Sequence, residues 1–219
     1  MSAKYILFDL DETLYPRDAG LMQEISKRIS LYMAEKMGFS SEKVKRLRNE
    51  YSQLYGTTLR GLHIHYHIDP DEFLEYVHDI PLDHYLRPDK ALDEMLADIP
   101  LEKFIFTNAS EKHARRVLEA LGISHHFPRI LDIRAVDYIS KPDERAYQCA
   151  LKLLKAKGEE CIIVEDNVRN LKAAKELGMT TVLVDKEPEN DIVDFTIKNI
   201  VELKKVIDII QGMGSGRAT

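Results

Sequence analysis

Five short apolar runs constrain the fold of this 219-residue chain more than any other feature of its sequence. Four of them are continuous apolar or β-branched stretches without polar alternation. That pattern is typical of parallel strands that are covered by helices on both faces. The remaining run is weaker, because Asp132 interrupts it. We expect strands at residues 5–8, 104–106, 130–133, 161–164 and 181–184.

Helical segments separate the later strands, and a glycine follows each segment. Glycine just past the last turn accepts the left-handed conformation that closes a helix. The segments and their glycines are 110–121 with Gly122, 143–154 with Gly158, and 167–177 with Gly178. Because strand–helix–strand units cross over with a right hand, this alternation predicts an α/β fold with a doubly wound, Rossmann-like parallel sheet.

The long stretch after the first strand breaks this alternation, because it reads as helix throughout. Leu21, Ile25 and Ile29 recur at helical spacing, and Asp69 and Pro70 form a typical helix start. We therefore expect an all-helical cap inserted after the first strand. The predicted division is a core at 1–16 and 88–211, a cap at 17–87 and a disordered tail at 212–219.

Two candidate clusters follow the first and second strands. Asp9 and Asp11 come directly after the first strand, and ligands bind just beyond the carboxyl ends of parallel strands. One carboxylate can attack or bind a metal ion while the other handles a proton. Thr107 and Asn108 follow the second strand, where a hydroxyl, an amide and backbone N–H groups can form an anion cradle. Taken alone, each cluster also fits an ordinary turn or helix cap.

Two further clusters follow the third and fourth strands. Lys141 stands before Pro142, whose fixed φ would stiffen the position of the lysine. Glu165 and Asp166 end a buried apolar run, and paired carboxylates suit Mg²⁺, a hard cation that prefers oxygen ligands. Asn167 or Asp166 can equally cap the next helix. The four clusters gain their significance together, because each falls at the end of a different strand.

Charge and composition exclude several classes of function. The formal net charge is −6, and no basic block is present, which argues against a partner that is a nucleic acid polymer. The two cysteines, Cys149 and Cys161, form no metal-ligand spacing and indicate a reducing compartment. The apolar run at the N-terminus is too short for a membrane span or a signal peptide. We expect a cytoplasmic protein without a membrane partner.

The four clusters resemble the motifs of the haloacid dehalogenase-like superfamily, in the same order and at the same places relative to the strands. Asp9, Asp11 and Thr13 resemble its first motif. The second, third and fourth motifs correspond to Thr107, Lys141 and the pair Glu165 and Asp166. The resemblance covers almost the whole chain, and the helical insert resembles the cap that the family carries between its first two motifs.

This resemblance implies a Mg²⁺-dependent phosphomonoester hydrolase. Asp9 is expected to attack phosphorus and form an aspartyl-phosphate, and Asp11 to protonate the leaving oxygen and then deprotonate water. The dehalogenases of the superfamily lack the second aspartate, so Asp11 indicates an oxygen leaving group. The implied Mg²⁺ ligands are Asp9, the main-chain carbonyl of Asp11, and Asp166, with Glu165 assisting. The implied phosphoryl-binding residues are Thr107, Asn108 and Lys141.

A narrower resemblance is to the pyrimidine 5′-nucleotidase subfamily. Residues 9–16 resemble its opening, residues 55–62 its cap signature and residues 83–88 its return segment. The resemblance implies a nucleoside 5′-monophosphate as substrate, UMP or CMP in particular. Arg60, flanked by Gly61 in the cap signature, is the candidate specificity residue, although it can also be a surface charge.

Alternatives remain open at this stage. The core motifs fit equally a phosphatase or phosphomutase for sugar phosphates, or a phosphoglycolate phosphatase, because the cap sets specificity. A non-enzymatic phospho-receiver domain shares the parallel sheet, the acids and the lysine, but it has no place for the helical cap. His63, His65 and His67 lie in a helical region that would spread them around the axis, which favours a plain or substrate-facing role over zinc. The chain can be a monomer or a homodimer.

Overall fold

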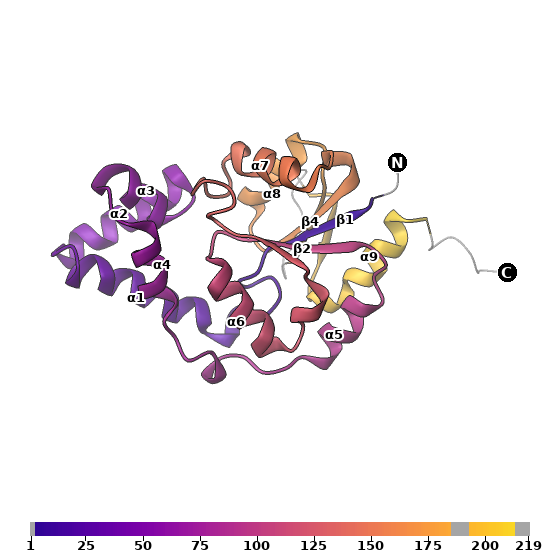
Figure 1. The fold of residues 1–219 in the computed structure, drawn as a ribbon, viewed down its shortest axis with the longest axis horizontal. Coiled ribbons are helices and arrows are strands. Elements are labelled where there is room, and N and C mark those ends of the chain that lie inside the picture. Colours follow the sequence, from indigo (N-terminus) through magenta and orange to yellow (C-terminus); the bar gives the residue numbers. More distant parts are fainter. Residues whose placement is uncertain (1–2, 185–192, 213–219) are drawn as a thin grey trace.

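A computed structural model of the chain describes residues 3–184 and 193–212. In this part of the chain, six strands form one sheet in the order β3-β2-β1-β4-β5-β6, and all neighbouring strands are parallel (Figure 1). The strands are β1 (Tyr5–Phe8), β2 (Glu102–Phe106), β3 (Arg129–Leu131), β4 (Cys161–Glu165), β5 (Thr180–Val184) and β6 (Phe195–Ile197). The predicted α/β doubly wound fold is confirmed.

Helices cover both faces of the sheet because the central strands are apolar on both sides. Alternate residues of β1 point in opposite directions. Ile6 and Phe8 pack with the cluster that includes α5 (Lys90–Ala97), α6 (Glu111–Leu121) and α9 (Leu203–Ile210). Leu7 packs with the cluster on α7 (Glu144–Leu154) and α8 (Val168–Glu176). Figure 1 shows these two helical layers on opposite faces of the sheet.

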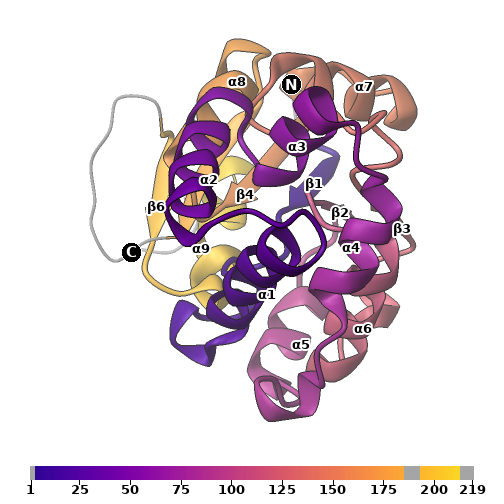
Figure 2. The ribbon, with the colours of Figure 1, turned by 90° about the vertical axis from the view of Figure 1, so that its left-hand side faces the viewer.

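Only helices lie between β1 and β2. Four of them, α1–α4, gather beyond the carboxyl edge of the sheet and form the cap, seen from the front in Figure 2. They are α1 (Leu21–Glu35), α2 (Ser41–Tyr55), α3 (Thr58–Tyr66) and α4 (Pro70–His78). Asp69 caps α4 as expected, because its side chain accepts a hydrogen bond from the backbone N–H of Asp71 at 2.8 Å. The short 3-10 helices are η1 (Arg17–Ala19), η2 (Leu82–His84), η3 (Ser124–His126), η4 (Gly158–Glu160) and η5 (Ile200–Glu202).

The first cap helix connects the two parts of the molecule. Leu21 and Ile25, at the start of α1, are buried in the same apolar cluster as Phe8 of the sheet. Tyr32 and Met33, at its end, are buried in the second cluster with α2 and α4. Because this one helix packs in both clusters, the packing does not mark where the cap begins. The cap boundaries at residues 17 and 87 stay predictions.

Three local expectations are corrected by the structure. Strand β3 ends at Leu131 and not at residue 133, because the Asp132 side chain accepts hydrogen bonds from the backbone N–H groups of Glu111 and Ala135 and bends the chain away. Helix α7 closes at Lys155, which adopts a left-handed φ of 54°, and not at Gly158. Strand β6 was not predicted, because its three residues give too short a pattern to read.

Two further predictions concern the C-terminal tail and the membrane. Gly212 is described, but the rest of the predicted disordered tail lies outside the described residues. Among the described helices, none has the length and the apolar character needed to cross a bilayer. The cytoplasmic location stays a prediction.

Candidate active site

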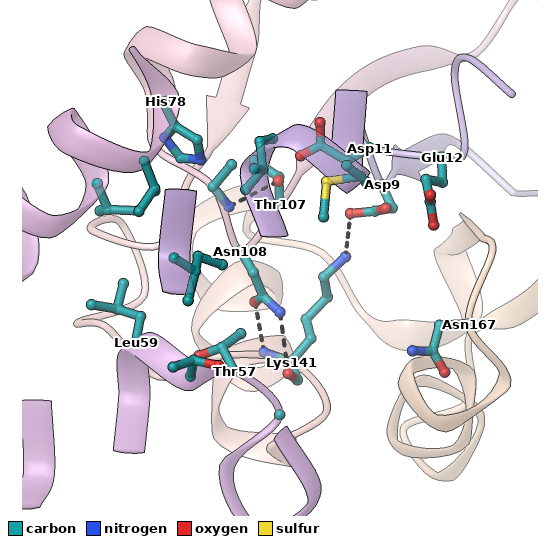
Figure 3. A pocket seen from close by; sticks show the side chains of 18 of the residues that line it. Asp9, Asp11, Glu12, Thr57, Leu59, His78, Thr107, Asn108, Lys141 and Asn167 are labelled. Carbon is teal, nitrogen blue, oxygen red and sulfur yellow. Dashed lines mark hydrogen bonds and ion pairs between the residues drawn. The ribbon is translucent and has the colours of Figure 1, made fainter. Parts of the chain in front are cut away.

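The carboxyl ends of β1, β2 and β4 meet at the edge of the sheet that faces the cap. Phe8, the last residue of β1, pairs with Ile105 on one side and Val164 on the other, at the point where the strand order changes direction. The residues that follow these strands therefore converge. A cavity of about 290 Å³ lies between this edge and the cap, and Asp9, Asp11, Thr107, Asn108, Lys141 and Asp166 all line it (Figure 3).

Lys141 joins the ends of three strands, β1, β2 and β4. Its Nζ atom donates to Asp9 Oδ1 at 2.8 Å, to Glu165 Oε1 at 2.7 Å and to the carbonyl oxygen of Phe106 at 2.9 Å. The lysine side chain is 1 % exposed and Glu165 is fully buried. A buried ammonium is tolerated only when it is paired and hydrogen-bonded, and all three donors here have an acceptor.

The pKa values of this group follow from burial and from that pairing. Burial raises the pKa of Asp9 to about 7, and Lys141 opposes the rise. Burial also raises the pKa of Glu165. Burial lowers the pKa of Lys141, but Asp9 and Glu165 raise it by more, so the ammonium stays charged. A divalent cation beside Asp9 would favour its ionised form.

Asp9, Glu165 and Asp166 fit a hard divalent cation. Each offers a carboxylate oxygen, and these three oxygens lie within 4.8 Å of one another. Oxygen donors on a tight turn suit Mg²⁺. Glu165 is already engaged, because Lys141 and the Asn170 side chain donate to Oε1 and the backbone N–H of Asn167 donates to Oε2. A cation here would be held by the two more accessible carboxylates, Asp9 and Asp166, while Glu165 would orient the groups around them.

Arg17, which the sequence did not single out, reaches this set of acids. It follows Pro16, and its NH2 donates to Asp166 Oδ2 at 2.8 Å and to the carbonyl oxygen of Asp166 at 3.2 Å. Its Nε lies 3.5 Å from Glu12 Oε2. Burial raises the pKa of Asp166, and Arg17 opposes that rise.

The Asp11 carboxylate is not one of the three close oxygens and has its own partners. The hydroxyl of Tyr15 donates to Asp11 Oδ1 at 2.6 Å, and His113 Nε2 lies 3.1 Å from the same oxygen. Burial raises the pKa of Asp11, but His113 and Tyr15 outweigh it, and the net shift is downward. The sequence did not predict either contact. His113 is 102 residues away along the chain, and nothing in the sequence shows that the nearby Tyr15 points back to Asp11.

Thr107 and Asn108 line the cavity but are partly engaged within the loops. The Thr107 hydroxyl oxygen accepts the backbone N–H of Ala109 at 3.0 Å, which leaves the hydroxyl proton for a ligand. The Asn108 side chain bonds both backbone groups of Lys141: Oδ1 accepts its N–H at 2.8 Å and Nδ2 donates to its carbonyl at 3.2 Å (Figure 3). Asn108 thus fixes the backbone that carries the lysine.

The family follows from a comparison of the whole chain with known proteins. Residues 3–178 match the model of the haloacid dehalogenase-like hydrolases. The chain belongs to this family. The match spans all four clusters and the helical insert, so the predicted superfamily is confirmed.

Two relatives of this hydrolase have names that refer to phosphate metabolism or to a phosphatase. It is 26% identical to "Phosphate metabolism protein 8" of Saccharomyces cerevisiae over 94% of this chain and 73% of the yeast protein. It is 26% identical to "Glyceraldehyde 3-phosphate phosphatase" of Methanocaldococcus jannaschii over 96% of this chain and 98% of that protein. A HAD phosphatase from Thermococcus onnurineus has the same fold, with a TM-score of 0.63, 22% identity and full coverage of both chains.

The cap side of the cavity in this haloacid dehalogenase-like hydrolase is mostly apolar. The polar cap residues on the wall are Thr57, Thr58 and His78. Burial lowers the pKa of His78 well below its ordinary value, and His113 adds to this, so the imidazole is neutral. The apolar side chains from the cap are Met22, Ile25, Ile29, Leu59, Phe73, Leu74 and Val77. Lys141 is the one cationic side chain among the described residues that line the cavity.

Arg60 lies elsewhere. It does not line this cavity, and its NH1 donates to the carbonyl oxygen of Tyr138 at 3.1 Å, on the loop before Lys141. The backbone N–H of Arg60 donates to the Thr57 hydroxyl, which caps α3. Its predicted substrate role has no support from this position and stays a prediction.

The cap histidines have local partners. His65 Nε2 lies 2.7 Å from the Tyr55 hydroxyl, and His63 Nδ1 lies 3.2 Å from the carbonyl oxygen of Ile68. His67 ends α3 in the left-handed conformation. These contacts account for the conformation of the segment without a ligand.

Proposed function

We propose that this hydrolase removes a phosphoryl group from a small phosphomonoester, with Asp9 as the nucleophile and Mg²⁺ as the cofactor. The observation that carries the proposal is the position of the Asp9 carboxylate. It lines the cavity and accepts a hydrogen bond from Lys141 Nζ at 2.8 Å. One of its oxygens lies within 4.8 Å of a carboxylate oxygen of Glu165 and of Asp166. A phosphate dianion repels a carboxylate, so an attacking Asp needs positive charge beside it.

The residues support a two-step reaction. In the first step Asp9 forms a bond to phosphorus, the bond to the substrate oxygen breaks, and the protonated form of Asp11 supplies a proton to that oxygen. In the second step Asp11 takes a proton from water, which displaces Asp9 from phosphorus. The Lys141 ammonium reduces the negative charge of the phosphoryl oxygens, and the Thr107 hydroxyl binds one of them. Mg²⁺, held by Asp9 and Asp166, would supply further positive charge to the transferring group.

The lining of the cavity favours an uncharged leaving group. A second phosphate or a carboxylate on the substrate would meet an apolar cap wall and no cation other than Lys141, which is already paired. Leaving an anion in such a place without a partner is costly. This argument favours UMP or CMP, whose bases are neutral, and disfavours phosphoglycolate and the bisphosphate intermediate of a phosphomutase.

Glyceraldehyde 3-phosphate is the second candidate substrate. The named activity of the relative from Methanocaldococcus jannaschii favours it, and its aldehyde is also uncharged. The cap supplies enough apolar surface for a pyrimidine base, which a three-carbon sugar would leave unfilled. We therefore rank the pyrimidine nucleotides first.

Phosphate release from a substrate panel tests the proposal. UMP, CMP, AMP, glyceraldehyde 3-phosphate, phosphoglycolate and glucose 1-phosphate should be compared at equal Mg²⁺ with wild type and Asp9→Asn. We expect UMP and CMP to give the highest kcat/KM and Asp9→Asn to abolish release. Equal turnover of phosphoglycolate would reject the uncharged-leaving-group argument, and full activity of Asp9→Asn would reject the nucleophile.

A further inference from the structure

The Asp11 carboxylate is held from two sides by buried donors. Both the Tyr15 hydroxyl, at 2.6 Å, and His113 Nε2, at 3.1 Å, meet Oδ1. Tyr15 is 3 % exposed and His113 is 1 % exposed. Since both donors use one oxygen, Oδ2 remains for a proton that is exchanged with the leaving oxygen or with water.

The orphaned nitrogen of His113 indicates which way its hydrogen bond runs. Among the described residues, His113 Nδ1 has no hydrogen-bond partner, and it is buried. An N–H placed there would be desolvated without an acceptor. We therefore assign the tautomer that carries its proton on Nε2, where Asp11 Oδ1 accepts it.

The imidazole of His113 is fixed in place by its surroundings. Its ring stacks on His78 with centroids 4.1 Å apart and planes 16° from parallel. Ser110, the N-cap of α6, accepts the backbone N–H of His113 and contacts His78 Nδ1 at 3.3 Å. Arg116, one turn along α6, donates to the carbonyl oxygens of His78 and Ile80. The ring is thus held between a core helix and the last residue of a cap helix.

We propose that His113 and Tyr15 are positioning residues for the acid–base step, which they serve by fixing the orientation of the Asp11 carboxyl group. The proposal rests on the proposed function, because it assigns Asp11 the proton transfer to the leaving oxygen. Neither residue lines the cavity, so both act through Asp11 and not on the substrate. A carboxyl group that can rotate transfers its proton less often in the productive direction.

The leaving group separates this role from a purely structural one. p-Nitrophenolate departs without a proton, whereas an alkyl oxygen needs one. The value of kcat/KM, which covers all steps up to departure of the leaving group, should be measured for p-nitrophenyl phosphate and for the alkyl phosphomonoester that the wild type hydrolyses fastest. Asp11→Asn calibrates the full effect of losing the acid.

The variants are Tyr15→Phe, His113→Leu and His113→Gln. We expect Tyr15→Phe and His113→Leu to lower kcat/KM for the alkyl substrate about 10- to 100-fold and for p-nitrophenyl phosphate by less than about 3-fold. His113→Gln should recover part of the loss, since its side-chain amide can donate to Oδ1. If His113→Leu does not fold, Tyr15→Phe decides, because it keeps the ring and removes only the hydroxyl.

Matched controls remove the same groups elsewhere. Tyr76→Phe deletes a hydroxyl that donates to Glu35 at 3.0 Å, and His126→Leu deletes an imidazole 2.7 Å from Asp93. Both should leave the ratio of the two substrates unchanged. An equal loss on both substrates in the Tyr15 and His113 variants, or no loss, would overturn the proposal. A wild type that hydrolyses neither substrate would instead overturn the proposed function.

Discussion

The Lys141 side chain lies at the centre of the candidate site and connects Asp9, which follows β1, with Glu165, the last residue of β4. It pairs with these two carboxylates, and the carbonyl oxygen of Phe106, at the end of β2, accepts its third hydrogen bond. The same ammonium therefore stabilises the fold and reduces the repulsion between Asp9 and an incoming phosphate. Removal of its charge should affect both properties.

For Lys141→Gln we expect the free energy of unfolding to fall by about 3 kcal/mol, because Asp9 and Glu165 lose their buried partner. Phosphatase activity should fall at the same time. Urea denaturation and phosphate release measure the two effects. Lys112→Gln, which removes an exposed ion pair with Glu75, should leave both nearly unchanged. A Lys141→Gln protein as stable as wild type would contradict the pairing.

His78 gives a prediction about pH. Burial lowers its pKa well below the ordinary value of 6.5, His113, Arg116 and Arg134 add to this, and Asp11 opposes it. The folded protein therefore disfavours the protonated imidazole, so stability is full above pH 6.5 and falls as the pH drops below it. His78→Gln should lose less stability than wild type between pH 7 and pH 5, as measured by urea denaturation. An identical pH dependence in both proteins would contradict the neutral state of His78.

At the residue scale, the sequence predicted the groups that follow strands but not the contacts between them. Asp9, Thr107, Lys141 and Asp166 were recognisable because each stands next to a readable apolar strand or its loop. The Asp11–His113 contact was not, since His113 sits on a helix face that reads as ordinary amphipathic packing. Arg60 was singled out from a glycine-flanked motif, which does not reveal which way a side chain points, and its substrate role stays a prediction.

At the scale of elements, the turn between α2 and α3 lies directly on the loop that carries Lys141. The Ser140 hydroxyl donates to the carbonyl oxygen of Tyr55 at 2.7 Å. Gly56 has a φ of 82°, and a Cβ placed on it would lie 2.2 Å from the carbonyl oxygen of Lys141. Only glycine allows this approach, so the cap turn and the loop that carries Lys141 are in backbone contact.

Gly56→Ala should therefore displace the turn from the loop and lower kcat/KM by about 10- to 100-fold, since a shift of an ångström at a site can have that effect. Gly38→Ala is the matched control. Gly38 has a similar φ of 66°, but no atom lies within 4 Å of its added Cβ. It should cost only stability, by about 1 kcal/mol. If both variants keep wild-type kcat/KM, the contact does not position the loop.

The elements themselves were largely predictable, because a long apolar strand or an amphipathic helix repeats its signal over many residues. The sequence pattern fails to predict where an element ends when tertiary contacts or the backbone conformation of one residue set that end. Strand β3 ends early because the Asp132 side chain bonds two backbone N–H groups, and α7 ends at Lys155 because a non-glycine residue takes the left-handed conformation. Asp132 does interrupt the apolar run, but the local pattern shows neither its hydrogen bonds nor the end of α7 at Lys155.

At the scale of the whole molecule, an acidic protein has to bind an anionic substrate. The formal net charge is −6, and Lys141 is the one cation among the described residues on the cavity wall. The wall also carries Asp9, Asp11, Glu12 and Asp166. A divalent cation would reduce this excess of negative charge, which is why the proposal includes Mg²⁺.

Chelation with EDTA should abolish phosphate release, and added Mg²⁺ should restore it. Mg²⁺ should also raise the melting temperature of the wild type, because a ligand that binds only the folded state stabilises it. Asp166→Asn should lose this shift in melting temperature, while Asp208→Asn, a change on α9 outside the cavity, should keep it. Activity that persists in EDTA would contradict the metal.

The most direct test of the central claim is to trap the phosphoenzyme. Asp11→Asn should be mixed with p-nitrophenyl phosphate, whose leaving group needs no proton, and Mg²⁺, then quenched in acid within its first turnover and analysed by peptide mass spectrometry. We expect one phosphoryl group on Asp9, because the variant cannot activate water to remove it. A phosphoryl group on another residue, or none in a variant that still releases p-nitrophenolate, would contradict Asp9 as the nucleophile.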